Sequence, residues 1–288
     1  QRTDERFAYP IKMITRDIVA EIERIVASDQ NTLKLVKQPA FGSPLVGFAG
    51  GGDELFDFYK ADIGDVLLLP HEWLARKHGR SFDRQDITVV CWALPQTEST
   101  KEKMRAQTEQ PCKEWALNRT FGEEFNRYLA AQIESWFESQ GVPAVAPMAR
   151  PDFSWGRSEK YGFASNWSER HAAHIAGLGT FGLCDGLISK LGKAVRYGSV
   201  IVAVPLKPSA RDYTTYREYC RADRGCTGCI NRCPAGAITR EGGHDKDKCV
   251  AYQKEHVVPY AQQAFGFEGT YGCGLCQTKV PCESCCPD

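Results

Sequence analysis

Apolar residues recur at the spacing of an amphipathic helix in two long segments of the chain. Residues 15–28 place three isoleucines on one helical face. In residues 119–141, aromatic and aliphatic residues repeat at intervals of three and four, and Gly141 follows as a stop signal. The pattern predicts two helices, each with one buried face.

Short apolar runs that end at glycine or proline predict the strands. Residues 86–95 are rich in β-branched and apolar residues and end at Pro95. Similar runs occupy residues 43–52, 142–147 and 198–206. Residues 65–79 indicate a helix in which Pro70 either bends the helix or marks its start. Helices interspersed with strands predict a mixed α/β (α+β) body.

Length and charge restrict the class of protein. The chain has 288 residues, 42% of them hydrophobic, and a formal net charge of zero. Such a chain can form one large domain or a domain with a small module, and its charge favours neither nucleic acid nor an acidic membrane as a partner. No apolar run is long enough to cross a bilayer, and residues 1–26 lack the apolar core of a signal peptide. We expect a cytoplasmic protein with no membrane partner.

The cysteines are concentrated in the last quarter of the chain. Of the 13 cysteines, only Cys91, Cys112 and Cys184 precede residue 220. A small disulfide-stapled secreted protein would spread its cysteines more evenly. We therefore predict a cysteine-poor domain over residues 1–209 and a metal-cluster domain over residues 210–288, with the boundary in a polar segment. We expect Cys91 and Cys184 to be small buried residues.

The spacing Cys226-x2-Cys229-x3-Cys233-Pro234 is close to the iron–sulfur motif of bacterial ferredoxins. Asp223 occupies the place of the first cysteine of that motif, and Cys220 lies three residues earlier, as if the first step were lengthened. In ferredoxins with two clusters, the cysteine before the proline ligates the other cluster.

This crossing gives two ligand sets, and hence two [4Fe–4S] clusters in a ferredoxin-like domain. The first set contains Cys220, Cys226 and Cys229 together with one of three late cysteines, Cys282, Cys285 or Cys286. The second set consists of Cys233, Cys249, Cys273 and Cys276. A zinc ribbon and a single cluster are the alternatives, since paired cysteines also bind zinc.

The glycine motif Gly177-x-Gly179-x-x-Gly182 resembles a dinucleotide fingerprint but lacks its context. The fingerprint requires a strand before the glycines and an acidic residue about twenty positions later. Residues 168–176 indicate a helix instead, and the later segment is apolar. Glycine indicates either a structural turn or a close approach of the backbone to another body, such as a flat macrocycle.

Four parts of the chain together resemble the epoxyqueuosine reductase and reductive dehalogenase superfamily. They are residues 165–189, the strand 198–206, the cysteine loop and residues 272–283. The resemblance covers roughly residues 85–288. It implies a nitroreductase-like, corrinoid-binding domain joined to a ferredoxin module with two clusters. It also implies that Cys282 is the late ligand.

The resemblance further implies that base-off cobalamin binds the α/β domain and receives electrons from the clusters. The residues expected near it are Asn166, Gly177, Leu178, Gly179, Thr180, Phe181 and Gly182. A ferredoxin or flavodoxin would donate the electrons, and a small electrophilic molecule would be the substrate. Epoxyqueuosine reductases carry an acidic aspartate where this chain has Phe163. That departure, with the neutral net charge, makes nucleic acid an unexpected partner.

A reductive site needs a proton donor, and the candidates are Tyr161, His171 and His174. The two histidines would share a helical face, and their alternative role is hydrogen bonding within the core. We expect Glu169 and Arg170 to form an ion pair or a helix-end contact. Besides the corrinoid-dependent reductase, two functions compete: a tRNA-modifying enzyme, and an electron-transfer protein whose α/β domain binds flavin, a partner or nothing.

Overall fold

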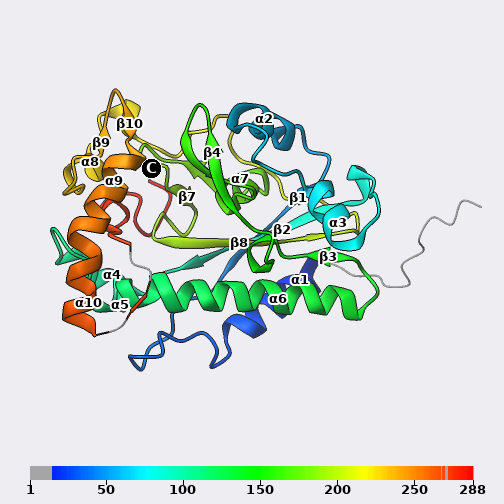
Figure 1. The fold of residues 1–288 in the computed structure, drawn as a ribbon, viewed down its shortest axis with the longest axis horizontal. Coiled ribbons are helices and arrows are strands. Elements are labelled where there is room, and N and C mark those ends of the chain that lie inside the picture. Colours follow the sequence, from blue (N-terminus) through cyan, green and yellow to red (C-terminus); the bar gives the residue numbers. More distant parts are fainter. Residues whose placement is uncertain (1–14, 267, 270–271, 288) are drawn as a thin grey trace, which may run out of the picture.

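The computed structural model describes residues 15–266, 268–269 and 272–287. At its centre is an antiparallel four-stranded sheet in the order β1-β2-β8-β3 (Figure 1). Its strands are β1 (Leu45–Gly50), β2 (Thr88–Pro95), β3 (Ala144–Val145) and β8 (Val195–Val202). The four apolar runs of the sequence thus form one sheet, and Val90 of β2 lies opposite Val200 of β8.

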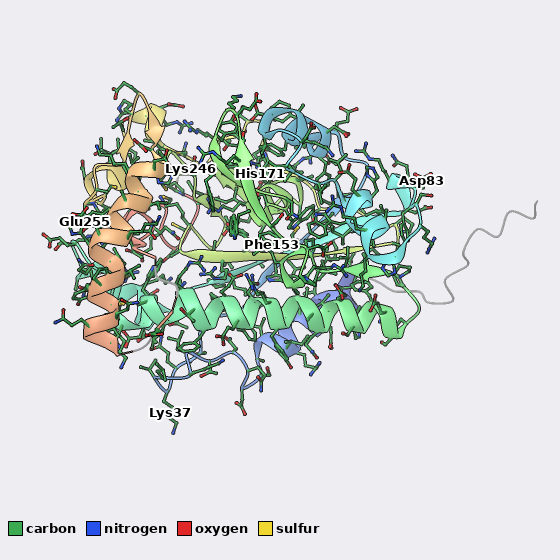
Figure 2. The ribbon with its side chains drawn as sticks, viewed as in Figure 1. Lys37, Asp83, Phe153, His171, Lys246 and Glu255 are labelled. Atoms are coloured by element: carbon green, nitrogen blue, oxygen red, sulfur yellow. The ribbon has the colours of Figure 1, made fainter. Side chains whose placement is uncertain are left out.

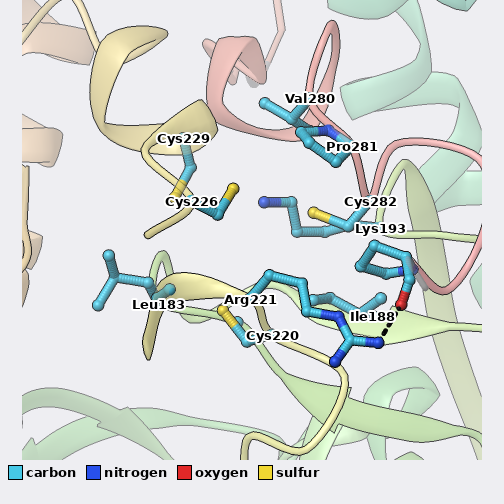
Figure 3. A pocket seen from close by; sticks show the side chains of 13 residues that line it. Leu183, Ile188, Lys193, Cys220, Arg221, Cys226, Cys229, Val280, Pro281 and Cys282 are labelled. Carbon is cyan, nitrogen blue, oxygen red and sulfur yellow. Dashed lines mark hydrogen bonds between the residues drawn. The ribbon is translucent and has the colours of Figure 1, made fainter. Parts of the chain in front are cut away.

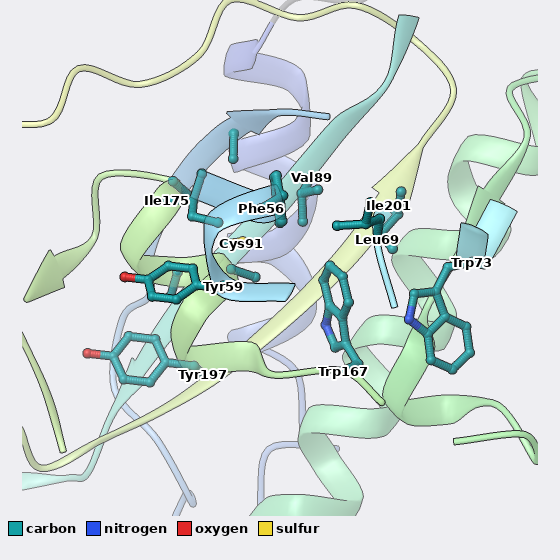
Figure 4. Close-up of a cluster of buried hydrophobic side chains, with 14 of the residues drawn as sticks. Phe56, Tyr59, Leu69, Trp73, Val89, Cys91, Trp167, Ile175, Tyr197 and Ile201 are labelled. Carbon is teal, nitrogen blue, oxygen red and sulfur yellow. The ribbon is translucent and has the colours of Figure 1, made fainter. Parts of the chain in front are cut away.

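Helices cover both faces of this sheet, which is why β2 is apolar along nearly its whole length. On one face, Val90, Trp92 and Leu94 pack against α1 (Thr15–Val26) and α6 (Glu123–Ser139). On the other face, the alternate residues of β2 join the core beneath α2 (Glu54–Ile63), α3 (Pro70–His78) and α7 (Glu169–Ile175). Figure 4 shows part of this second core, with Val89 and Cys91 near Tyr59 and Trp167.

The predicted helices are present; α1 begins at Thr15 as expected, whereas α3 and α6 begin later than their predicted ranges. The isoleucines of α1 are buried as expected, at positions Ile18, Ile22 and Ile25. Pro70 is the first residue of α3 and does not bend it, because the first turn of a helix needs no donor from proline. Helix α6 begins at Glu123, after a π-helical turn over Asn118–Gly122.

In the described part of the chain, three hairpins lie outside the main sheet. They pair β4 (Trp155–Ser158) with β5 (Gly162–Ser165), β6 (Gly179–Phe181) with β7 (Leu187–Ser189), and β9 (Ile238–Thr239) with β10 (Gly243–His244). Short 3-10 turns span Arg84–Asp86, Pro147–Ala149, Ala222–Arg224 and Leu275–Gln277, and a π turn spans Gln253–Val257.

The cysteine-rich segment, which begins at residue 210, lies at one end of the sheet, beside α4 (Glu98–Arg105) and α5 (Lys113–Leu117) (Figure 1). It contains α8 (Gly228–Asn231), α9 (Lys246–Tyr252) and α10 (Val258–Phe265). Arg232 donates to the carbonyl oxygen of Gln107 at 2.6 Å, and Arg105 pairs with Glu283. These contacts attach the segment to the body. Over the described ranges, no helix is long and apolar enough to cross a membrane.

Candidate cluster and cofactor sites

Four cysteines line one small cavity: Cys220, Cys226, Cys229 and Cys282 (Figure 3). These residues, which we call the first thiol set, are those expected to share a cluster. Cys282 reaches the cavity because its carbonyl oxygen accepts a hydrogen bond of 2.8 Å from the backbone of Lys193. Of the late cysteines, Cys285 is exposed, and neither it nor Cys286 lines this cavity.

Cys233, Cys249, Cys273 and Cys276, the second thiol set, line part of a much larger cavity of about 2490 Å³. Cys233 follows α8 and Cys249 lies in α9, whereas Cys273 and Cys276 flank the start of the 3-10 turn Leu275–Gln277. Burial raises the pKa of Cys273 to about 11. A bound metal would have to displace the proton of this thiol.

The donor chemistry of both sets suits iron–sulfur clusters, which take four soft thiolates. Within the described ranges, no three His, Cys, Asp or Glu side chains converge closely enough to hold a single metal ion. The thiols instead surround open space, at the edges of the two cavities.

Cys184 and Lys193 lie where the two thiol sets meet. Both are buried, at 6% and 3% exposure, and the ammonium of Lys193 donates to Sγ of Cys184 at 3.2 Å. Hydrogen bonds with Cys229, from the first set, and Cys276, from the second, lower the pKa of Cys184. Cys184 is buried as expected, but it also contacts chemistry-bearing residues, which the sequence pattern did not indicate.

The large cavity is bounded by α2, the β4–β5 hairpin, α7, the start of α6 and the cysteine-rich segment. Figure 2 labels three of its lining residues: Phe153, His171 in α7 and Lys246 in α9. All three expected proton donors, Tyr161, His171 and His174, line it. The tertiary structure therefore brings these side chains and the second thiol set to one cavity.

The two histidines are held as neutral rings. His171 shares a 2.7 Å hydrogen bond with the hydroxyl of Ser168, and burial lowers its pKa to about 3. His174 donates from Nδ1 to the carbonyl oxygen of Gly179 at 2.7 Å, and burial lowers its pKa also. At neutral pH neither ring is an imidazolium, so neither acts as a strong acid there.

Tyr161 lies at the cavity rim and is 41% exposed. Its hydroxyl donates to Oδ2 of Asp62 at 2.7 Å, and Lys160 pairs with the same carboxylate. Burial and the Asp62 hydrogen bond raise the pKa of Tyr161. The phenol therefore keeps its proton at neutral pH, beside a carboxylate that orients it.

The glycines of the 177–182 motif approach the protein's own backbone. A side chain on Gly179 would collide with the carbonyl oxygen of Ile188, across the β6–β7 hairpin. Gly177 has φ +79°, and a Cβ there would lie 2.8 Å from the carbonyl oxygen of Ala210. A helix precedes these glycines and a strand follows, so the order of elements is not that of a dinucleotide site.

The other expected cofactor contacts are divided among several places. Phe181 lines the large cavity and Gly182 lines the first thiol cavity, whereas Leu178 and Thr180 are buried. Asn166 is buried and bonded within the protein: it donates to the carbonyl oxygen of Asp152 at 2.9 Å and accepts from the Ser154 backbone at 3.1 Å.

Three residues that line the large cavity carry buried polar atoms with no hydrogen-bond partner. These atoms are both carboxyl oxygens of Glu169, Nε of Arg196 and Oε1 of Gln96. Burial raises the pKa of Glu169 to about 8. The expected ion pair of Glu169 with Arg170 is not formed, because Arg170 donates to the carbonyl oxygen of Asp185 at 2.6 Å.

Aromatic rings from distant parts of the chain form one wall of this cavity. Phe181 stacks on Tyr216 at 4.6 Å, His174 stacks on Tyr213 at 4.9 Å, and the ring of Tyr59 meets His171 edge-on at 4.4 Å. The three tyrosines were missed at the sequence level. They lie in α2 and in a polar connection, and nothing in the local pattern separates them from ordinary packing residues.

Sequence comparisons relate the chain to one group of enzymes. No protein-family model matches it. It is 32% identical to the epoxyqueuosine reductase of Bacillus cereus over 117 residues, which are 40% of this chain and 29% of that protein. It is 28% identical to the enzyme of Gloeobacter violaceus over 207 residues, 69% of this chain and 56% of the relative. The chain thus spans about half or less of the curated relatives it matches.

Solved structures show the same fold at low identity. An epoxyqueuosine reductase bound to a modified tRNA-Tyr stem loop aligns with a TM-score of 0.53 and 16% identity, over 93% of this chain and 64% of that one. A catabolic reductive dehalogenase aligns with a TM-score of 0.51 and 15% identity, over 84% and 30% of the two chains. The expected resemblance is confirmed: this chain is similar in sequence to epoxyqueuosine reductases, and it shares the mixed α/β fold of epoxyqueuosine reductases and reductive dehalogenases.

Proposed function

We propose that the protein is a corrinoid-dependent reductase that uses two [4Fe–4S] clusters to reduce an electrophilic small molecule. The observation that carries this proposal is the shared cavity: the second thiol set lines the same space as Tyr161, His171 and the aromatic wall. Electrons on a cluster bound by those thiols would lie beside the large cavity, which has room for a macrocycle and a substrate.

The proposed roles follow the predicted domain boundary, since residues 210–288 contain all eight proposed cluster ligands. The first set lines the small cavity and the second set lines part of the large one, which supports two clusters over one. Thiols arranged around open space suit a four-iron cluster better than a zinc ion, whose four ligands lie about 2.3 Å from one point. The electron donor would be a low-potential carrier of the ferredoxin or flavodoxin class.

Base-off cobalamin is the cofactor that we propose for the large cavity, where it would supply low-potential one-electron chemistry and a nucleophilic metal. Tyr216, which is 40% exposed and is backed by the buried ring of Phe181, offers a flat apolar surface for a ring face. Tyr161 is the proposed proton donor, and Asp62 orients its hydroxyl.

Cobalamin binding tests this proposal. We expect the anaerobically purified protein to take up cobalamin, with a change in visible absorbance, and Tyr216→Ala to weaken the binding about tenfold through the loss of ring contacts. Tyr260→Ala is the matched control, because Tyr260 is 37% exposed, close to the 40% of Tyr216, but does not line the cavity. A wild-type protein that binds no cobalamin would leave an electron-transfer or flavin-binding role instead.

A modified tRNA nucleoside is the second candidate substrate. The β4–β5 hairpin carries a stacked pair at the cavity rim, Trp155 and Phe163, with ring centroids 4.8 Å apart and 58% and 51% exposed. Arg157 and Lys160 belong to the same hairpin region and also line the cavity. Exposed aromatic rings among basic residues are typical of surfaces that stack on nucleotides. One structural relative is bound to a tRNA stem loop, which runs against the expectation that nucleic acid is an unlikely partner.

A stem-loop binding assay distinguishes the two candidate substrates, a small molecule and a tRNA nucleoside. If tRNA is the substrate, the Trp155→Ala variant should bind a fluorescent anticodon stem loop at least tenfold more weakly than wild type, because base stacking is worth about 1–3 kcal/mol. Leu35→Ala is the control, since Leu35 is 51% exposed and lies outside the cavity lining. Equal, salt-sensitive binding by all three proteins would indicate non-specific attraction and favour the small-molecule substrate.

A further inference from the structure

Lys193 is a buried cation placed between the two thiol sets. It lies two residues before β8, and it lines both the first thiol cavity and the large cavity. Figure 3 shows its side chain entering the first cavity near Cys226 and Cys282. Burial of a lysine to 3% exposure is costly, so a compensating negative group is expected nearby.

The surroundings of Lys193 supply sulfur for this purpose. Its ammonium donates to Sγ of Cys184 at 3.2 Å. Its backbone amide donates to the carbonyl oxygen of Cys282 at 2.8 Å, which fixes the base of the side chain. Gly186 leaves room for the stem, since a Cβ there would come within 2.8 Å of Cδ of Lys193. The side chain is therefore directed among the thiols by packing from three sides.

We propose that Lys193 raises the reduction potential of the cluster held by the first thiol set. The inference rests on the clusters of the proposed function. A cluster with four thiolate ligands gains one negative charge when it takes up one electron. A fixed positive charge nearby stabilises this reduced form more than the oxidised form, and the effect is large where water is excluded. Hydrogen bonds and net charge near the sulfurs are the usual means by which a protein tunes such potentials.

The test is an anaerobic redox titration of the iron-loaded protein with dithionite as the one-electron reductant, followed by electron paramagnetic resonance. In Lys193→Met the reduction potential of the first cluster should fall by at least about 59 mV. This corresponds to a tenfold loss in the stability of the reduced cluster relative to the oxidised one. Lys193→Arg keeps the charge and should lie near the wild-type potential. Lys190→Met is the matched control, because Lys190 is 66% exposed and pairs with Asp212 at 3.2 Å.

The outcomes distinguish this inference from the proposed function. A Lys193→Met protein with full iron content and the wild-type potential would overturn the role of Lys193, as would an Arg variant shifted as far as the Met variant. If the Met variant assembles poorly, Lys193→Gln, which keeps a donor without the charge, decides by the same measurement. A wild-type protein without clusters overturns both proposals. A wild type with clusters but without cobalamin overturns only the cofactor, and a shift in Lys193→Met would still support the tuning role.

Discussion

The Cys282→Ser variant, purified without oxygen, should hold about four iron atoms per chain, whereas wild type should hold about eight. Cys282 completes the first thiol set in the small cavity, although 53 positions separate it from Cys229. A serine hydroxyl is a poor ligand for iron in a site built for soft thiolates. Iron and sulfide analysis, with visible absorbance, measures the loss.

Cys285→Ser is the control for this experiment, because the two cysteines are three residues apart but only Cys282 lines the cavity. The control should retain about eight iron atoms per chain. If Cys285→Ser loses iron while Cys282→Ser does not, the late ligand is wrongly assigned. A wild-type protein with about four iron atoms, or with zinc, would contradict the two-cluster proposal itself.

We expect Cys233→Ser to remove the cluster of the second set and leave the first intact, although Cys233 is only four residues from Cys229. The reason is the placement of the thiols: Cys233 lines the large cavity with Cys249 and Cys273, and Cys229 lines the small one. The single variant should again hold about four iron atoms per chain.

Double variants identify which cluster is lost. Adding Cys249→Ser to Cys233→Ser should cause no further loss of iron, because both cysteines belong to the second set. Adding Cys226→Ser should remove the remaining iron, because Cys226 belongs to the first. The reverse result, with Cys226→Ser costing nothing more, would mean that neighbours in the sequence share a cluster and that the ligation is not crossed.

The local pattern of the chain was sufficient for most of the elements that frame the site. Residues 15–28, 86–95 and 119–141 gave a helix, a strand and a helix as expected, since their apolar spacing is set by the face that they bury. The start of α3 at Pro70 also follows from local stereochemistry. The pattern did not predict α2 or the β4–β5 hairpin, whose aromatic residues face a cavity and so break the usual separation of apolar and polar faces.

The cavity itself is a product of packing between distant segments. The tyrosines of the wall come from α2 and from the connection after β8, and they meet α7 only because the sheet brings those segments together. Likewise, the glycine motif indicated close backbone approach but not its partner, which proved to be the facing strand β7 and the backbone at Ala210. The need for glycine is visible locally in the sequence, but the backbone group that leaves no room for a side chain lies elsewhere in the chain.

The sequence by itself determined which cysteines were available and the short steps between them, because ligand spacing within one loop is a local property. It also determined the apolar faces of the long helices and the central strands. Only the tertiary structure decided that Cys282 enters the first cavity, that the second set opens on the chamber of Tyr161, and that Lys193 lies between the sets. These arrangements depend on how the cysteine-rich segment docks against the sheet and α4, and such contacts between remote residues leave no periodic trace in the sequence.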